Sequence, residues 1–179
     1  MQPPIALRRG DLGDRDVIVA TFRAGLESYV EFAPAGWRPP EPEGELERTA
    51  DLLGDPDTWA TLALVAGEPV GHVAFLPARE RAIGETPGDW RSRAPLPGVA
   101  HLWQLFVLPD WWGAGVAPAL HATATEEMAA RGYERARLYT PADHARGRRF
   151  YERRGWELAE CGHDPALGLD LAEYRLELS

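Results

Sequence analysis

The sequence has only one cysteine, Cys161, among its 179 residues. A single cysteine cannot form an internal disulfide, which excludes the disulfide-rich class of secreted domains and fits a reducing compartment. The amino-terminal MQPPIALRRG lacks the apolar run of a signal peptide, and no segment approaches the roughly 18 uninterrupted apolar residues of a membrane span. We therefore expect a cytoplasmic protein without a membrane partner.

Positive charge is also scarce. The chain has 19 Lys and Arg residues against 28 Asp and Glu residues, and its formal net charge is -9. Nucleic-acid binding depends on clustered cations that release counterions, so we expect no nucleic-acid partner. Hydrophobic residues make up 45% and charged residues 26% of the chain, as in ordinary globular proteins. A chain of this length can bury a sizeable core, and we expect a single domain over residues 1–179.

The hydrophobic periodicity predicts an α+β fold around one mixed sheet. Strands are predicted at residues 5–8, 58–66, 69–76, 99–107 and 135–140, followed by a final pair that begins at Gly155 and ends with LAEYRLEL. Helices are predicted at about residues 15–31, 46–53 and 116–128, and around Phe150. Gly132 is placed to end the third helix, and Asp143 is placed to cap the last one.

Residues 77–98 predict a connection that is longer than compact domains usually contain. The segment has four prolines, three glycines and four arginines. Loops of this length are functional or disordered. A lid here would favour a small enclosed substrate, whereas an open groove with an acidic border would favour a peptide.

The segment LFVLPDWWGAGVAPAL joins a buried strand to a helix through a glycine-containing turn. The first turn of a helix has backbone N–H groups without partners, and with the helix dipole they favour a phosphate or pyrophosphate. Gly113 and Gly115 would let such an anion approach the backbone. The segment is neither a P-loop, since no Lys and Ser/Thr follow the glycines, nor a dinucleotide fingerprint, since Pro118 stands in place of the third glycine.

The same segment resembles the GNAT N-acetyltransferase pattern, in which a strand ending in V-x-P and an aromatic residue leads into Q/R-x-x-G-x-G/A. The matching residues are Val107, Pro109, Trp111, Gly113, Gly115 and Ala117, and Trp112 stands where Gln or Arg is usual. A second segment, HARGRRFYERRGW, resembles the family's N-x-x-A-x-x-x-Y-x-x-x-G-F. There Tyr151, Gly155 and Trp156 are in register, while His144 and Gly147 replace the usual Asn and Ala.

This resemblance implies a GNAT-like α+β fold, with a mixed, mostly antiparallel central sheet of six to seven strands and helices on both faces. It also implies acetyl-CoA as the co-substrate, with its pantetheine arm along the end of a strand and its pyrophosphate on the turn. The implied cofactor-binding residues are Phe106, Val107, Trp112, Gly113, Ala114, Gly115, Val116, Ala117, His144 and Arg149.

The resemblance makes Tyr151 the proton donor to the CoA thiolate. A phenol has a reference pKa of about 10 and a thiol one of about 8.5, so the phenol is protonated at neutral pH and can supply this proton. His101 is a candidate general base, because a neutral imidazole is available near pH 7. Water or an acidic residue on the same strand is the alternative base in this family.

The expected acceptor is the amine of a small molecule. Candidate substrate-binding residues are Glu27, Tyr29, Trp37 and Trp103, of which the first three follow one another around the end of the first helix. The alternatives are a protein or peptide N-acetyltransferase and a non-catalytic acyl-CoA binding module. The histidines and Cys161 show no metal-ligand spacing, so we expect no metal. The exposed sheet edges of such a fold would permit a homodimer.

Overall fold

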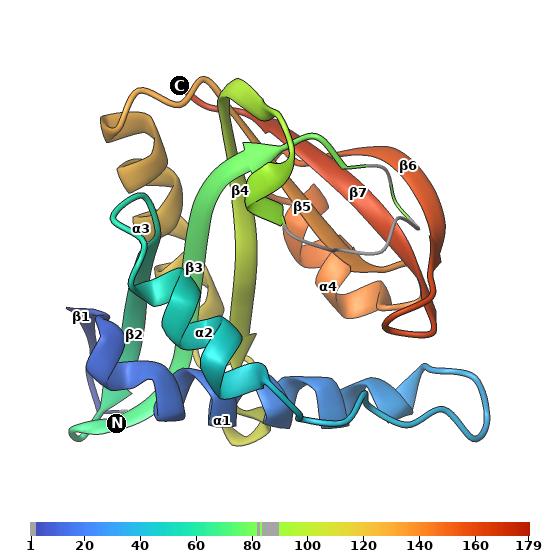
Figure 1. Cartoon of the computed structure of the whole chain (residues 1–179). Helices are drawn as coiled ribbons and strands as arrows, with labels where there is room; N and C mark the ends of the chain where they lie inside the picture. Colours follow the sequence, from blue (N-terminus) through green and yellow to red (C-terminus); the bar gives the residue numbers. More distant parts are fainter. Residues whose placement is uncertain (1–2, 82, 84–89) are drawn as a thin grey trace. The chain divides into compact units, whose positions relative to one another are not determined.

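The computed structural model of the chain describes residues 3–81, 83 and 90–179. Seven strands in this described part form one sheet in the order β1-β2-β3-β4-β5-β7-β6 (Figure 1). The strands are β1 (Ile5–Arg9), β2 (Trp59–Val65), β3 (Glu68–Arg79), β4 (Pro95–Val107), β5 (Arg135–Pro141), β6 (Glu157–Asp164) and β7 (Leu169–Glu177). The α-helices are α1 (Arg15–Ser28), α2 (Glu45–Leu53), α3 (Val116–Ala130) and α4 (Ala145–Glu152). The prediction of an α+β fold with a mixed, mostly antiparallel sheet is confirmed.

The chain divides into two compact units. The first comprises the residues up to Ser28, Glu41–Leu76 and Trp103–Glu127. The second comprises Tyr29–Pro40, Pro77–Leu102 and Met128–Ser179. Strands β3 and β4 and helix α3 each contribute residues to both units. The single domain expected from the sequence stays a prediction.

The first unit contains β1, β2 and most of β3, paired antiparallel in that order. Its core cluster consists of Ile18, Ala60, Leu62 and Ala74, against which Val17, Leu53, Leu64 and Trp103 pack. The periodicity of α1 explains this arrangement, because one stripe of the helix is buried while the other faces are not. At the short 3-10 turn that leads into α1, the Asp11 N–H donates to Asp14 Oδ2 at 3.0 Å and the Gly13 N–H donates to Asp11 Oδ1 at 2.7 Å, which caps the turn.

The second unit contains β5, β7 and β6. Strand β5 pairs in parallel with the start of β4, over Val99–His101 and Arg135–Arg137, and antiparallel with β7. Helix α4 lies against the face of this part of the sheet that presents Tyr174, because Arg148 Nε donates to the Tyr174 hydroxyl at 2.8 Å. Side chains alternate along a strand, so the partners Arg137 and Arg175 point to the opposite face.

Two sequence predictions need correction. The predicted loop over residues 77–98 is shorter at both ends, because β3 continues to Arg79 and β4 already begins at Pro95. Prolines are tolerated at strand ends, so those of this segment do not mark its limits. A 3-10 turn lies at Trp90–Ser92, and residues 82 and 84–89 of the predicted loop lie outside the described residues.

The predicted cap of α4 is also wrong. His144, not Asp143, is the N-cap residue of α4, and its side chain makes no capping hydrogen bond. The backbone makes the turn instead, since the Ala145 N–H donates to the carbonyl of Asp143 at 2.9 Å. None of the described helices is long and apolar enough to cross a membrane.

Candidate functional site

The turn between β4 and α3 belongs to the first unit and begins with the short 3-10 helix η4 (Pro109–Trp111). The Trp112 N–H donates to the Pro109 carbonyl at 3.1 Å, which closes this helix. Gly113 and Gly115 then have φ values of 78° and 86°. Both lie in the left-handed region that favours glycine, so these residues shape the turn that leads into α3.

Several backbone N–H groups at this turn lack acceptors. Those of Gly113, Gly115, Val116 and Ala117 donate to no residue that the structure describes. A Cβ atom added at Gly113 would meet nothing within 4 Å, so open space adjoins the backbone there. Unpartnered N–H groups at a helix amino terminus bind anions, because each can donate and the helix dipole adds to the attraction. The turn can therefore hold a phosphate or pyrophosphate group.

Trp112 connects this turn to the end of β4. Its indole Nε1 donates to the Val107 carbonyl at 2.9 Å, while the Leu108 N–H donates to the Val70 carbonyl of β3 at 2.9 Å. The family pattern has Gln or Arg at this position. Here the Trp112 side chain instead makes a hydrogen bond within the protein. The sequence did not predict this contact, because it joins residues whose relation depends on the folded turn.

The side chains of Phe106 and Val107 belong to the first unit's interior. Val107 is buried, and the Phe106 ring lies edge-on to Phe22 with 5.3 Å between the ring centroids. A Cβ atom at Gly25 would collide with the Phe106 ring, so glycine is needed there for this packing. The side chains of both residues are therefore engaged in packing within the first unit.

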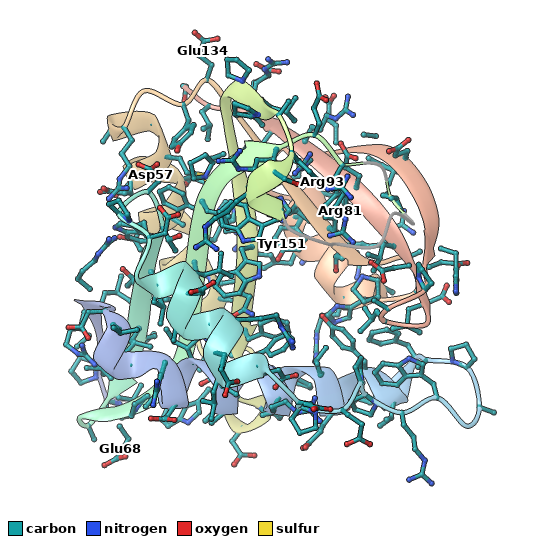
Figure 2. All side chains as sticks on the ribbon, viewed as in Figure 1. Asp57, Glu68, Arg81, Arg93, Glu134 and Tyr151 are labelled. Atoms are coloured by element: carbon teal, nitrogen blue, oxygen red, sulfur yellow. The ribbon has the colours of Figure 1, made fainter. Side chains whose placement is uncertain are left out.

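Tyr151 belongs to the second unit and is labelled in Figure 2. It is half-buried on α4, with the rings of Phe150, Trp156 and Tyr174 at centroid distances of 5.2, 5.8 and 6.5 Å. Loss of solvation raises its pKa above the ordinary value for tyrosine. Its hydroxyl makes no hydrogen bond to any residue within the described ranges. A protonated and uncommitted phenol can donate a proton to a leaving group.

His144 and Gly147 form a matched pair at the start of α4. The His144 ring stacks on Phe32, with centroids 4.8 Å apart and an interplanar angle of 17°. A Cβ atom at position 147 would lie 2.6 Å from His144 Nδ1, so the alanine usual in the family would collide with this imidazole. The two departures from the family pattern are therefore physically linked. Loss of solvation, with a smaller effect of Arg146, lowers the pKa of His144 to about 4, so the ring is neutral at pH 7.

Tyr29, Phe32, Trp37 and His144 form an aromatic cluster in the second unit. Tyr29 lies 5.1 Å from Phe32, 6.4 Å from Trp37 and 5.5 Å from His144, measured between ring centroids. Trp37 is held in place by Nε1, which donates to the Leu167 carbonyl at 2.9 Å. Tyr29 and Trp37 were predicted from the sequence as substrate-binding residues, but Phe32 was not. Its spacing of three residues from Tyr29 could have indicated that the two rings lie close together.

The other predicted site residues lie elsewhere. Glu27 is exposed and Trp103 packs against the core cluster, and both belong to the first unit. Arg149 is exposed on α4, and its side chain has no polar partner in the described part of the chain. It therefore has a free guanidinium in the second unit.

His101 is half-buried on β4 in the second unit. Its Nδ1 accepts a hydrogen bond of 3.4 Å from Arg137 Nε, and its ring lies 5.4 Å from that of Tyr139. Loss of solvation, followed by the charges of Arg137 and Arg81, lowers the pKa of His101 to about 3. An imidazole with so low a pKa is a weak base at pH 7, because a general base works best with a pKa near the operating pH. The role of His101 as base stays a prediction that this environment disfavours.

Among the residues that the structure describes, no group of three or more His, Cys, Asp or Glu side chains is arranged to hold a metal ion. Cys161 is exposed. The described residues thus offer a phenol without a hydrogen-bond partner at Tyr151 and N–H groups without acceptors at the α3 turn.

Comparisons with known proteins agree with this chemistry. Residues 24–156 match the family model described as the acetyltransferase (GNAT) family. The match includes the turn before α3, both residues of the His144–Gly147 pair, and Tyr151. No curated protein sequence matches the chain.

Solved structures with a similar fold include the PaiA N-acetyltransferase of Thermoplasma acidophilum in complex with coenzyme A. That structure is 15% identical, with a TM-score of 0.68, and the alignment covers 97% of this chain and 99% of that one. The ribosomal-protein-alanine N-acetyltransferase of Brucella melitensis is 20% identical over 97% of this chain and 99% of its own, with a TM-score of 0.69. An aminoglycoside 6'-acetyltransferase type Ii is 15% identical over 97% of each chain, with a TM-score of 0.68. Because the family model matches most of the sequence, the chain belongs to the GNAT acetyltransferase family and is an N-acetyltransferase that uses acetyl-CoA.

Proposed function

We propose that this protein transfers an acetyl group from acetyl-CoA to the amine of a small molecule by direct attack of that amine. The observation that carries the proposal is the turn before α3, whose N–H groups at Gly113, Gly115, Val116 and Ala117 lack acceptors. These groups would hold the pyrophosphate of the co-substrate. The thioester of acetyl-CoA supplies the activated acetyl group.

Tyr151 would act as the general acid. Its raised pKa keeps the phenol protonated at neutral pH, and its hydroxyl is not committed to another described residue. Proton donation to the departing thiolate needs both properties, and a positioned acid typically contributes about 10²- to 10⁴-fold to the rate. His144 and Arg149 would contact the co-substrate from α4, and Phe106, Val107, Trp112 and Ala114 would border it from the first unit.

The amine must be neutral when it attacks. An alkyl ammonium with a pKa of about 10.4 costs roughly 4–5 kcal/mol to deprotonate at pH 7. His101 was the candidate for this step, but its lowered pKa makes it a poor base at pH 7. Strand β4 has no acidic residue, so water is the remaining proton acceptor of those expected from the family resemblance. His101 would then be a hydrogen-bonded histidine of the strand.

The aromatic cluster supports an apolar or aromatic amine as acceptor. Phe32 and Trp37 are half-buried, and Tyr29 is buried against them. Aromatic rings of this kind favour flat or apolar groups over a peptide backbone. Glu27 and Trp103 would take part only if residues 1–179 act as a single domain, and we propose that they do.

Calorimetric titration with acetyl-CoA, followed by thiol release in the same sample over a panel of amines, tests this function. The structural relatives include enzymes named for aminoglycosides and for a ribosomal protein, and the likeness to both is one of fold alone. The panel therefore needs aromatic amines, aminoglycosides and peptides with a free amino terminus. The chain has no lysine, so its 19 basic residues are arginines and its own side chains add no acceptor amine to the assay.

Acetyl-CoA binding with release for small amines is the expected result. Release for peptides alone would replace the small-molecule acceptor with a peptide. Binding without release for any amine would favour a non-catalytic acyl-CoA binding module. An absence of binding would overturn the role of the α3 turn.

A further inference from the structure

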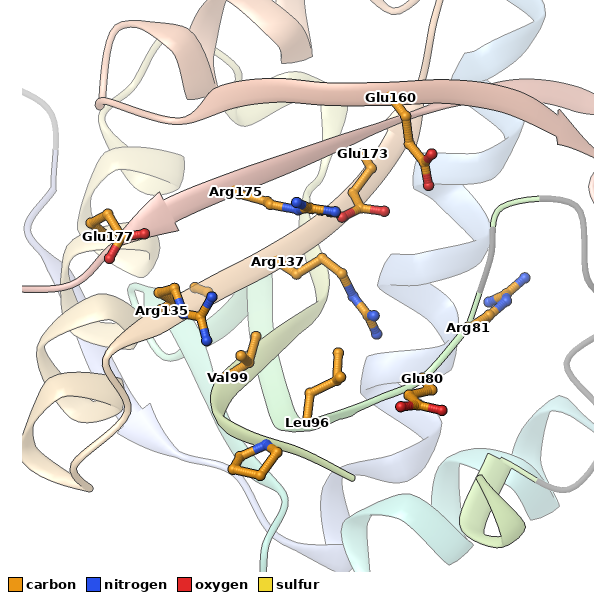
Figure 3. A pocket seen from close by; sticks show the side chains of 12 residues that line it. Glu80, Arg81, Leu96, Val99, Arg135, Arg137, Glu160, Glu173, Arg175 and Glu177 are labelled. Atoms are coloured by element: carbon orange, nitrogen blue, oxygen red, sulfur yellow. Dashed lines mark hydrogen bonds and ion pairs between the residues drawn. The ribbon is translucent and has the colours of Figure 1, made fainter. Parts of the chain in front are cut away.

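A pocket of about 620 Å³ lies in the second unit, on the face of β5 and β7 that points away from α4 (Figure 3). Four arginines line it: Arg81, Arg135, Arg137 and Arg175. Four glutamates also line it: Glu80, Glu160, Glu173 and Glu177. The walls thus carry equal numbers of positive and negative side chains. The acetyl transfer proposed above assigns no role to these eight residues.

Arg137 is the central group of this pocket. It is only 8% exposed, and Figure 3 shows its side chain directed from β5 into the space between Leu96 and Arg81. Its Nε donates to His101 Nδ1 at 3.4 Å and its Nη1 donates to the Arg79 carbonyl at 3.0 Å. Both acceptors are uncharged. Its Nη2 donates to no residue that the structure describes.

The nearby carboxylates do not neutralise this cation by a direct bond. Glu173 is 3% exposed, and its Oε1 accepts from Arg175 Nε at 2.7 Å. Asp164 is paired with Arg81 at 3.0 Å. Glu80, Glu160 and Glu177 are exposed. Among the described residues, Arg137 therefore lacks an ion-pair partner.

Such a group is costly to the folded protein. A buried charge is tolerated when a counter-charge and hydrogen bonds compensate for the lost water. Arg137 has two hydrogen bonds but no carboxylate within ion-pair distance among the described residues. Loss of solvation lowers its pKa, and the negative charge of Glu173 opposes this only in part. A carboxylate is the natural complement, because its two oxygens match the planar guanidinium and can accept from Nη2.

We propose that this pocket binds a small zwitterion of the amino-acid class, with its carboxylate on Arg137 and its ammonium group toward one of the two exposed glutamates that lie on either side of Arg137, Glu80 or Glu160 (Figure 3). Arg135 is exposed, has no polar partner in the described ranges, and adds a second cation to the wall of the pocket. The hydrophobic side chains of Leu96 and Val99 line the space and would contact the carbon chain. This site is independent of the proposed acetyl transfer, because its occupation needs no acetyl-CoA.

The test compares 5-aminopentanoate with 5-aminopentanamide, which keeps the chain and the amine but replaces the carboxylate with a neutral amide. Each is titrated calorimetrically into the full chain without acetyl-CoA. We expect the acid to bind at least about 10-fold more tightly than the amide, because a hydrogen-bonded ion pair is lost with the carboxylate. Equal affinity for the two compounds would overturn the proposal, as would binding of neither.

Variants locate the site. Arg137→Gln should weaken binding of 5-aminopentanoate at least about 10-fold, and Arg137→Lys, which retains the charge, should weaken it less. Circular dichroism melting shows whether these buried variants fold. Arg135→Gln, an exposed change that will not disturb the fold, should weaken binding by about 3-fold. Arg15→Gln, an exposed arginine on α1, is the matched control and should bind normally. Normal binding by both Arg135→Gln and a folded Arg137→Gln would contradict the proposed site.

The carboxylate can belong to the acceptor amine or to a separate effector. Acetyl-CoA-dependent thiol release with 5-aminopentanoate, with a KM raised about 3-fold in Arg135→Gln, would assign it to the acceptor. Binding without release, alongside release for other amines, would assign it to an effector. Both results support the site, and failure of the acetyl-CoA titration alone would count against the proposed function and not against this pocket.

Discussion

Tyr151 combines a raised pKa with a hydroxyl that no described residue engages. Replacement by phenylalanine keeps the ring contacts with Phe150 and Trp156 and removes only the proton. We expect Tyr151→Phe to lower kcat by about 10²-fold or more, the usual contribution of a general acid, with little change in the Kd for acetyl-CoA. Steady-state kinetics and calorimetry measure the two quantities.

Tyr133→Phe provides the matched control for this change. Tyr133 follows α3 and has no role in the proposed chemistry, so its hydroxyl should be dispensable for turnover. An unchanged kcat in Tyr151→Phe would remove Tyr151 from the mechanism and leave thiolate protonation to water.

The linkage between His144 and Gly147 gives a second residue-scale prediction. Gly147→Ala places a Cβ atom 2.6 Å from His144 Nδ1, so the imidazole must leave its stack on Phe32. We expect a loss of about 1–3 kcal/mol in the free energy of unfolding, as for other overpacked sites. Urea denaturation measures it.

The double variant His144→Asn with Gly147→Ala tests whether the two positions are coupled. It restores the residues usual in the family and removes the collision, so alanine at position 147 should cost much less in that background. If Gly147→Ala lowers the free energy of unfolding equally with His144 and with Asn at position 144, the collision with the imidazole is not the cause. The effect would then come from the backbone conformation of residue 147.

At the scale of the element, the α3 turn depends on glycine at a left-handed position. Gly113→Ala introduces about 1–2 kcal/mol of strain at φ 78° and distorts the turn whose N–H groups lack acceptors. We expect the Kd for acetyl-CoA to rise by about 5- to 10-fold. Gly132→Ala is the matched control, because Gly132 has φ 85° and equally open surroundings but follows the other end of α3.

Both alanine variants should lose similar stability, and only Gly113→Ala should lose affinity for the co-substrate. Calorimetric titration of the two variants with acetyl-CoA separates these effects. Equal affinities would mean that the co-substrate does not use this backbone.

At the scale of the whole molecule, buried imidazoles make stability depend on pH. His72 is 0% exposed, its Nε2 lies 2.7 Å from Gln104 Oε1, and its Nδ1 has no partner among the described residues. Loss of solvation lowers the pKa of His72 to about 4, against 6.5 in an ordinary histidine. The unfolded chain therefore binds this proton first, so the stability from the neutral ring is complete above pH 6.5 and is lost as the pH falls toward 4.

We expect His72 alone to lower the free energy of unfolding by about 1–2 kcal/mol between pH 7 and pH 5. Urea denaturation at the two pH values measures this difference. His72→Gln should reduce it, whereas His163→Gln, which changes an exposed histidine paired with Asp170, should leave most of it. A pH dependence that His72→Gln does not alter would contradict the assignment.

Local patterns in the sequence predicted most of the fold. The spacing of Ile18, Phe22 and Leu26 predicted α1, and the strand–turn–helix at Val107 to Val116 has both glycines at positive φ. The predicted loop at residues 77–98 was too long, because β3 and β4 extend into it. Its prolines and glycines are residue types that usually end strands, so the local sequence predicted no strand there. Local pattern cannot show how far a strand continues once a partner strand holds it.

The candidate site was less predictable for the same reason. Tyr151 and the α3 turn follow contiguous motifs, whereas Phe32 meets His144 across more than a hundred residues of chain. Arg137 lies beside His101 because the two residues are paired in the register of β4 and β5. In the sequence alone it is one of 19 arginines, and nothing distinguishes it from the others. Contacts between distant segments depend on the register of the sheet, and this register cannot be predicted from local sequence patterns.

The order in which segments alternate between the two compact units governs how the chain can fold during synthesis. The first unit needs Trp103–Glu127, which the ribosome makes after Tyr29–Pro40 and Pro77–Leu102 of the second unit. Neither unit can therefore be completed as an early, independent folding step, although many multidomain chains fold from the amino terminus in this way. Any single break in the chain leaves at least one unit without one of its segments.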